Sequence, residues 1–469
     1  MLRCILGQDG IFCIPPELAP PKITSVYPFS NAFVGGTTVS FTFSKNCVSG
    51  NITWTRTGGS SDALSPQTKS LTGAELSSGV HDSILLTNNP TLVNGSIYSV
   101  EFNCTDNLQA SVSVTSTNVT YGSTTARRVY GQFGSFTANT INNGGVSADS
   151  LNAPYAPFVD STGVYISDTA NSRVLFYPTG STTASRVYGQ LGSFTLSGAN
   201  QGGLSANSLS GPVGVAVTSA GVYISDNGNN RVLFYSGTST TASRVYGQLG
   251  SFTSNTPNNG GITANSLSNP FGSVAADSSG VYINDYTNNR VLYFSGTSTT
   301  ASRVYGQLGS FTSGTQNING ITTDSVFGPY GIAVDSKGFY LTDAGNNRAL
   351  FYPGTSITAS RVYGQLGSFI SGTSNLGGSV TANTLSNPTG IASDPSGVYI
   401  VDHLNMRLLY FIGSSTTASR VYGQLGSFTT AIINNGGVSA NSTFNPIGVA
   451  VDSNGIYYCD AGNNRALVF

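Results

Sequence analysis

Six aspartates each stand five residues before an arginine, and this spacing is the first pattern in the sequence that could do chemistry. A carboxylate beside a guanidinium can bind a substrate, shift a pKa, or hold two strands together as an ion pair. Because the pair recurs at the same place in every repeat, we predict a structural role. The pairs are Asp168–Arg173, Asp226–Arg231, Asp285–Arg290, Asp343–Arg348, Asp402–Arg407 and Asp460–Arg465.

Few other titratable side chains remain beyond residue 126. A second set of aspartates is predicted to end inner strands: Asp160, Asp277, Asp335, Asp394 and Asp452, with Thr218 at the sixth position. Asp149 and Asp324 are then the remaining acidic residues, and Lys337 and His403 are the single lysine and histidine. Since an enzyme site needs titratable groups that converge, we predict no catalytic residue, no metal, no cofactor and no enzyme activity.

Aromatic residues at one variable position are the candidates for ligand binding. The middle residue of a Pro-x-Gly-like segment changes from repeat to repeat: Tyr155, Val213, Phe271, Tyr330, Thr389 and Ile447. Tyr155, Phe271 and Tyr330 could stack on a sugar or clamp a peptide, or they could simply fill space. His403, with Met406, alters one repeated turn and is a fourth candidate; drift in a tolerant turn is the alternative.

Cysteines and glycosylation sequons favour a secreted protein. The five cysteines form no C-x-x-C and no cysteine–histidine cluster, so we expect no zinc site. Asn-x-Ser/Thr sequons occur at Asn51, Asn94, Asn103, Asn118 and Asn441, and the first four crowd into residues 51–120. No apolar run approaches the ~18 residues of a membrane span. The opening residues lack the apolar core of a signal peptide, so either a signal has been removed or the chain continues upstream.

A long repeat must position all of these residues. "RVYGQLGSF", or a close variant, begins at Arg128, Arg186, Arg244, Arg303, Arg361 and Arg420, at intervals of 58, 58, 59, 58 and 59 residues. One period holds four strand-like runs separated by Gly, Ser and Asn: 213–217, 221–225, 231–235 and 243–248. Four strands repeated six times predict an all-β fold, a six-bladed β-propeller over residues 127–469.

The order of the strands predicts how the propeller closes. The array starts with "RRVYGQ" at 127–132, before any inner strand, and stops at "NRALVF" (464–469), a third strand. Pairing 127–132 with 464–469 would complete the last blade. We expect this pairing because a closed ring leaves no exposed strand edges.

The repeat resembles a known family. Each period carries the Pro-x-Gly-like start, an apolar strand and then "D-x-x-N-x-R-V/A-L", as in "DNGNNRVLF" (226–234). This is similar to the NHL-repeat propellers, which include RNA-binding proteins, protein-interaction modules and some enzymes. The RNA-binding relatives need a basic face, whereas here 13 arginines and one lysine meet 13 aspartates, so no nucleic-acid partner is expected. The amidating-lyase relatives place a histidine-bound metal in the channel. Because His403 is the single histidine after residue 126, we do not expect this activity.

Residues 21–122 do not repeat and form a separate predicted domain. "SIYSVEFNC" (96–104) alternates apolar and polar residues, and Trp54 lies between Cys47 and Cys104. This resembles an immunoglobulin-like sandwich, and the resemblance implies a Cys47–Cys104 disulfide; two separate buried thiols are the alternative. Segment 1–20 carries Cys4 and Cys13, which could form a second disulfide.

Together these features predict a non-enzymatic extracellular or cell-surface glycoprotein with a structural or adhesive role. Charged residues make up only 8% of the chain and the net charge is −1, so little repulsion keeps copies apart. We therefore expect other copies of the chain as partners, for example in a filament. The alternative is a lectin-like or peptide-binding propeller that uses its long loops, such as 249–270, to bind carbohydrate or peptide.

Overall fold

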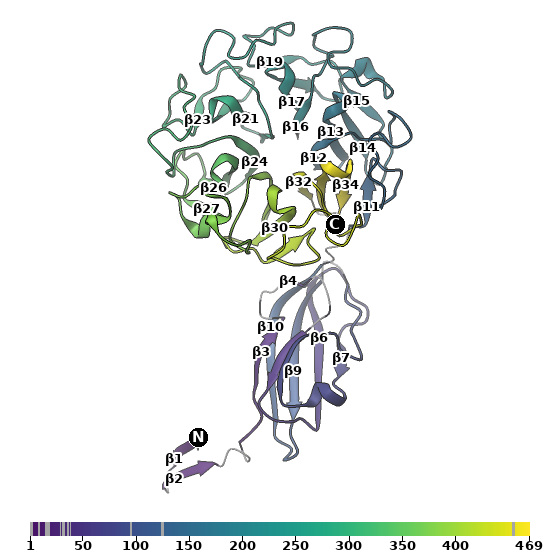
Figure 1. Ribbon diagram of the computed structural model, residues 1–469, viewed down its shortest axis with the longest axis vertical. Coiled ribbons are helices and arrows are strands. Elements are labelled where there is room, and N and C mark those ends of the chain that lie inside the picture. The colour runs from purple at the N-terminus through teal and green to yellow at the C-terminus, as the bar shows by residue number, and fades with distance from the viewer. Residues whose placement is uncertain are drawn as a thin grey trace. The chain divides into compact units, whose positions relative to one another are not determined.

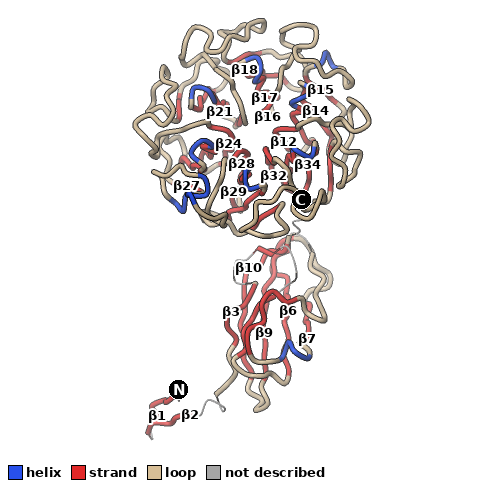
Figure 2. The backbone as a smooth tube through the Cα atoms, in the orientation of Figure 1, coloured by secondary structure: helices blue, strands red, loops and turns tan. Residues whose placement is uncertain are grey.

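A computed structural model describes residues 3–7, 10–14, 19–28, 30, 33–34, 37, 39–93, 96–122, 126–452 and 455–469. In this part of the chain every regular element is a strand, apart from 3-10 turns of three or four residues (Figure 2). The chain divides into two compact units, Met1–Ser123 and Thr124–Phe469.

The first unit contains a five-stranded and a three-stranded sheet. The five-stranded sheet has the order β4 (Phe33–Val34), β10 (Ser111–Tyr121), β9 (Ser96–Thr105), β6 (Ser49–Gly59) and β7 (Gln67–Ser70). The three-stranded sheet has the order β3 (Ile23–Tyr27), β5 (Val39–Phe43) and β8 (Gly79–Ile84). Residues alternate between buried and half-buried along β9, as expected for a strand with one face on a core.

The core of this unit is aromatic and contains a disulfide. Trp54 on β6 is fully buried, and its ring meets that of Tyr98 edge-on at 5.9 Å between centroids. Cys47 and Cys104 form the implied disulfide. Near the N-terminus β1 (Arg3–Gly7) pairs with β2 (Gly10–Ile14), and the backbone register sets Cys4 opposite Cys13. The side chains of these two cysteines lie outside the described part, so their disulfide stays a prediction.

The second unit is a β-propeller built from six four-stranded antiparallel sheets around a central axis (Figure 1). The first three sheets are β12 (Pro154–Asp160), β13 (Gly163–Asp168), β14 (Arg173–Pro178), β15 (Arg186–Tyr188); β16 (Pro212–Thr218), β17 (Gly221–Asp226), β18 (Arg231–Ser236), β19 (Arg244–Tyr246); and β20 (Val274–Ala276), β21 (Gly280–Asp285), β22 (Arg290–Ser295), β23 (Arg303–Tyr305). The next two are β24 (Pro329–Asp335), β25 (Gly338–Asp343), β26 (Arg348–Pro353), β27 (Arg361–Tyr363); and β28 (Pro388–Asp394), β29 (Gly397–Asp402), β30 (Arg407–Ile412), β31 (Arg420–Tyr422).

The last sheet joins the two ends of the array. It consists of β32 (Pro446–Asp452), β33 (Gly455–Asp460), β34 (Arg465–Val468) and β11 (Arg128–Tyr130). Strand β11 pairs antiparallel with β34, with Arg128 opposite Val468 and Tyr130 opposite Ala466. The ring therefore contains hydrogen bonds between its first and its last strand.

The inner strands approach one another so closely that the glycine of the Pro-x-Gly segment is needed. A Cβ atom at Gly331 would lie 2.1 Å from the carbonyl oxygen of Thr389 in the next sheet. Gly390 stands in the same relation to Ile447, and Gly448 to Tyr155. A side chain at these three positions would force neighbouring sheets apart, whereas the first sheet has Ala156 at the equivalent position.

Each repeated Asp–Arg pair is a buried ion pair within one sheet. In the second sheet, Arg231 Nε donates to Asp226 Oδ2 at 2.7 Å, and neither side chain is exposed. Asn229 donates to the same carboxylate oxygen, and the Ser210 backbone N–H donates to Oδ1. Burial raises the pKa of Asp226, while the Arg231 charge and these hydrogen bonds act in the opposite direction. The other five sheets contain the same ion pair.

The arginine of each pair also fixes the long loops. Arg231 Nη1 donates to the Phe252 carbonyl in the loop that follows the sheet, at 2.5 Å. Its Nη2 donates to the carbonyls of Ser205 and Ser208 in the loop that precedes the sheet, at 2.9 and 3.0 Å. One buried guanidinium therefore ties two loops to one sheet, which explains why the pair is present in every repeat.

Candidate functional site

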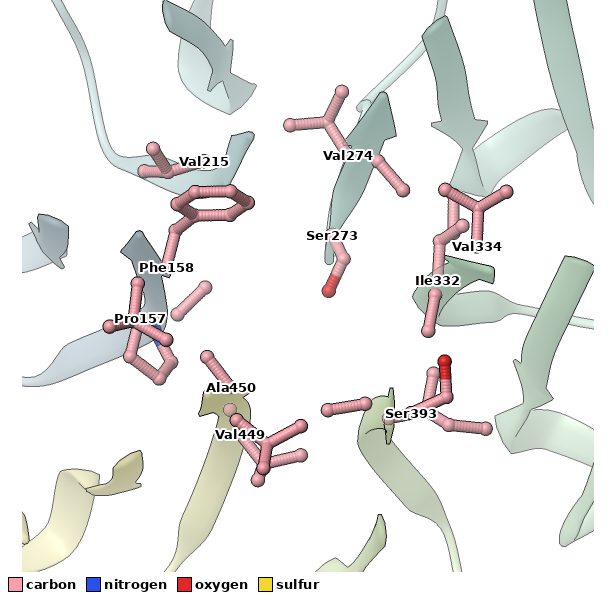
Figure 3. A pocket seen from close by; sticks show the side chains of 18 of the residues that line it. Pro157, Phe158, Val215, Ser273, Val274, Ile332, Val334, Ser393, Val449 and Ala450 are labelled. Carbon is pink, nitrogen blue, oxygen red and sulfur yellow. The ribbon is translucent and has the colours of Figure 1, made fainter. Parts of the chain in front are cut away.

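The channel along the propeller axis is the first candidate site. It contains a cavity of about 160 Å³ lined by the inner strands of all six sheets (Figure 3). The wall is mostly aliphatic, with Val215, Ile332 and Val449 among its members. Among the described residues that line it, Ser273 and Ser393 are the only polar side chains. Such a cavity suits a small apolar group with one or two hydroxyl contacts.

The three predicted ligand-binding aromatics come together, but they contact one another. Ring centroids lie 5.2 Å apart for Tyr155 and Phe271, 5.8 Å for Tyr155 and Tyr330, and 5.3 Å for Phe271 and Tyr330. All three are half-buried; Tyr155 and Tyr330 lie at the start of inner strands β12 and β24, whereas Phe271 precedes β20 by three residues. Burial raises the pKa of Tyr330. Each ring thus already has an aromatic partner, the arrangement expected of residues that fill space. Their role in binding a ligand stays a prediction.

His403 lies in the turn after β29 and contacts the neighbouring sheet. Its Nδ1 is 2.8 Å from the carbonyl oxygen of Pro446 on β32. Thr169 makes the equivalent contact in the first sheet, where its hydroxyl donates to the Pro212 carbonyl at 2.7 Å. His403 therefore contacts the neighbouring sheet in the same way as Thr169 in the first sheet. Within the described residues no three His, Cys, Asp or Glu side chains are grouped as a metal would require.

The second set of aspartates shapes hairpin turns. Asp277 Oδ1 accepts hydrogen bonds from the backbone N–H groups of Ser279 and Gly280 at 2.7 and 3.0 Å, which form the turn between β20 and β21. Asp394 does the same before β29. Side-chain oxygens of aspartate commonly stabilise turns in this way.

Cys459 is a free thiol, and it is fully buried on β33. Burial and, to a smaller extent, the charge of Asp460 raise the pKa of this thiol. The thiolate is the reactive form of cysteine, and burial of Cys459 disfavours it.

Sequence reasoning missed a ring of exposed apolar residues. The residue after Gln in each "RVYGQ" is between 48% and 61% exposed, although it is leucine or phenylalanine. We call this set the exposed apolar ring: Phe133, Leu191, Leu249, Leu308, Leu366 and Leu425. Every member has a φ between 47° and 53°, in the left-handed region that large side chains rarely adopt.

The long loops support the exposed apolar ring from one side. A Cβ atom at Gly202 would lie 3.2 Å from Leu191, and one at Gly144 would lie 2.7 Å from Phe133. These glycines let the loop pass beneath the apolar side chain. The sequence signal was the apolar residue between Gln and Gly in all six repeats, outside any strand.

Comparisons with solved structures give neighbours of low similarity. A nidogen/laminin complex matches with 12% identity, a TM-score of 0.39, and coverage of 79% of this chain and 92% of that one. A putative oxidoreductase (glucose dehydrogenase) from Thermus thermophilus matches with 13% identity, a TM-score of 0.37, and coverage of 68% and 96%. The PQQ-bound aldose sugar dehydrogenase of Streptomyces coelicolor matches with 13% identity, a TM-score of 0.36, and coverage of 69% and 95%. No protein-family model matches this chain, and no curated protein sequence matches it.

These neighbours correct one prediction. The scarcity of unmatched titratable residues led us to exclude an enzyme, yet glucose and aldose sugar dehydrogenases are among the neighbours. The exclusion was therefore wrong. Its physical weakness is that a cofactor can supply chemistry that the side chains lack. The propeller fold alone neither assigns an activity to this chain nor excludes one. Separately, no described helix has the length and apolar character needed to cross a bilayer.

Proposed function

We propose that this chain is an extracellular structural or adhesive glycoprotein that associates with other copies of itself. Its second unit is a six-bladed NHL-type propeller spanning residues 127–469, and residues 21–122 are an immunoglobulin-like sandwich. Six four-stranded sheets and the hydrogen bonds between β11 and β34 support the first assignment. Two packed sheets with a Cys47–Cys104 disulfide near Trp54 support the second.

The exposed apolar ring is the observation that carries this proposal. A leucine at positive φ costs about 1–2 kcal/mol relative to a residue that tolerates this conformation, and its exposed surface adds no stability to the monomer. Six such positions, presented by loops that buried arginines hold in place, form a repeated apolar surface. Because the same surface exists on every copy and the net charge is only −1, a second copy is the partner that fits it best.

Replacing Leu191, Leu249, Leu366 and Leu425 together by glycine is expected to abolish self-association, because it removes the exposed apolar side chains. Glycine adopts the left-handed backbone without steric strain, and unlike asparagine before Gly-Ser it creates no glycosylation sequon. The fold should therefore be retained, with a change in stability of about 1 kcal/mol per site at most. The measurement is sedimentation velocity over a concentration series. Ile370→Thr is the matched control, because Ile370 is 79% exposed but stands where other repeats have threonine. A parent chain that stays monomeric throughout, or a quadruple variant that still assembles, would contradict the proposal.

Glycan occupancy tests the extracellular assignment, which the disulfide supports. Asn118 is exposed on β10, whereas Asn51 and Asn103 are half-buried and directly opposite each other on β6 and β9. Opposite residues have Cβ atoms only about 5 Å apart, so we expect a glycan on Asn118 and on only one of the facing pair. Asn94 lies outside the described residues.

Intact-mass and glycopeptide analysis of the native protein, before and after deglycosylation, measures the glycan occupancy of Asn51, Asn103 and Asn118. Asn51→Gln should then raise the occupancy of Asn103. An entirely unmodified native chain would argue against secretion, and two glycans on the facing pair of one chain would contradict the steric argument.

A further inference from the structure

The junction between the last and the first sheet differs from the others in one side chain. In five sheets an arginine on the fourth strand stands opposite an aromatic residue on the third: Phe176, Phe234, Tyr293, Phe351 and Tyr410. In the first four of these sheets the guanidinium carbon lies 4.7–4.9 Å from the ring centroid. In the last sheet Arg128 stands opposite Val468. The ring that fills this position elsewhere is replaced by an isopropyl group.

A cavity of about 190 Å³ lies at this place. Its walls include Val468 and Tyr457 from the last sheet and Val159 and Val164 from the first. An apolar cavity of about 150 Å³ is large enough to bind benzene. The space therefore accepts one aromatic ring, with Arg128 beside it, as arginine accompanies the ring in the other sheets.

The polar part of the cavity also departs from the repeat. Arg127 lines it, where the other five repeats have serine: Ser185, Ser243, Ser302, Ser360 and Ser419. Asp160 and Asp452 line it as well. At the junction between the first and second sheets the two equivalent residues are Asp160 and Thr218, so that junction has one aspartate instead of two. Two arginines and two aspartates give the lining a formal charge of zero, with both signs present.

We infer that this junction binds a free aromatic amino acid. The ring occupies the space beside Arg128 and above Val468, the carboxylate pairs with Arg127, and the ammonium group faces the Asp160 side. A zwitterion matches a lining that presents both charges but no net charge, and guanidinium–carboxylate pairs are among the strongest charge-assisted hydrogen bonds. The site does not depend on self-association, so the two proposals can fail separately.

Isothermal titration of the full chain with L-phenylalanine is the test. Binding should be saturable with one site per chain. N-acetyl-L-phenylalanine amide, which has the ring without either charge, should bind at least roughly a hundredfold more weakly, since it loses two charge-assisted contacts. Absence of L-phenylalanine binding would overturn the inference. Equal binding of the amide would overturn the assignment of a free amino acid and point to a peptide instead.

The repeat itself provides matched variants. Val468→Phe restores the ring that five other sheets contain, so it should abolish binding while the melting temperature stays the same or rises. Arg127→Ser introduces the residue of the other repeats and should weaken binding roughly tenfold, by loss of one charge-assisted contact. Phe176→Val opens a similar space at a junction that has Ser185 in place of Arg127, and that space should bind no ligand. Binding that survives Val468→Phe would place the ligand elsewhere.

Discussion

Replacing Asp226 by alanine is expected to destabilise the propeller by about 3–5 kcal/mol, because the substitution leaves a buried arginine without its counter-charge. Both members of the pair are fully buried in the structure. The hydrogen bonds from Asn229 and from the Ser210 N–H are lost at the same time. Denaturant unfolding of the full chain, followed through the propeller's transition, measures the change in the free energy of unfolding.

Two further variants test whether the loss of stability comes from removing a carboxylate or from leaving Arg231 buried without a counter-charge. Asp277→Ala removes the same charge from a half-buried turn, where the carboxylate only accepts hydrogen bonds from the turn, and should cost about 1 kcal/mol. The double variant Asp226→Ala/Arg231→Met should be less damaging than Asp226→Ala alone, because it leaves no buried charge. If Asp226→Ala costs no more than Asp277→Ala, the repeated pairs do not stabilise the sheets.

The all-β class and the propeller could be read from the sequence because both follow from local patterns. Runs such as "GVYIS" and "RVLFY" are rich in β-branched and aromatic residues, lie between turn residues, and recur at one period. The structural role of Asp226 and Arg231 could be inferred from the same repetition, because a residue found at the same place in every sheet is expected to stabilise the sheet. Structure can be predicted from the sequence in this way where the same local pattern recurs in all six repeats.

Residues that differ between repeats were harder to predict. Tyr155, Phe271 and Tyr330 belong to different repeats, and only the closed ring brings them within contact of one another. Gly272 has a φ of 96°, and the inner strand of the third sheet begins at Val274, later than in the other sheets. Contacts of this kind form near the axis, where residues of several repeats meet. They cannot be predicted from the sequence of one repeat.

Backbone conformation was the other missing information. Leu191 and its equivalents follow a strand and precede a glycine, so the sequence shows an apolar residue near a turn. It does not show that the residue adopts a left-handed φ and is exposed. Likewise, the difference between "RALVF" and "RVLFY" is visible in the sequence, but only the pairing of β11 with β34 shows that Val468 faces Arg128.

Removing strand β11 is expected to have the other large effect. A chain of residues 134–469 loses the burial of Val129 and Tyr130, which are 2% and 1% exposed, a loss of about 3–6 kcal/mol. It also loses the hydrogen bond from Gln132 to the Asn464 carbonyl. The edge of β34 then presents unpaired backbone groups, and such an edge pairs readily with other chains.

The matched control is a chain of residues 126–469, which keeps β11 and corresponds to the second compact unit. We expect it to melt cooperatively, whereas the 134–469 chain should melt at a markedly lower temperature and form aggregates in size-exclusion chromatography with light scattering. Adding a peptide of residues 126–133 to the shorter chain should restore part of the lost stability, because β11 contacts β34 through a regular antiparallel ladder. If the two chains melt alike and neither aggregates more than the other, the ring does not depend on this strand, and the closure proposed for residues 127–132 and 464–469 is wrong.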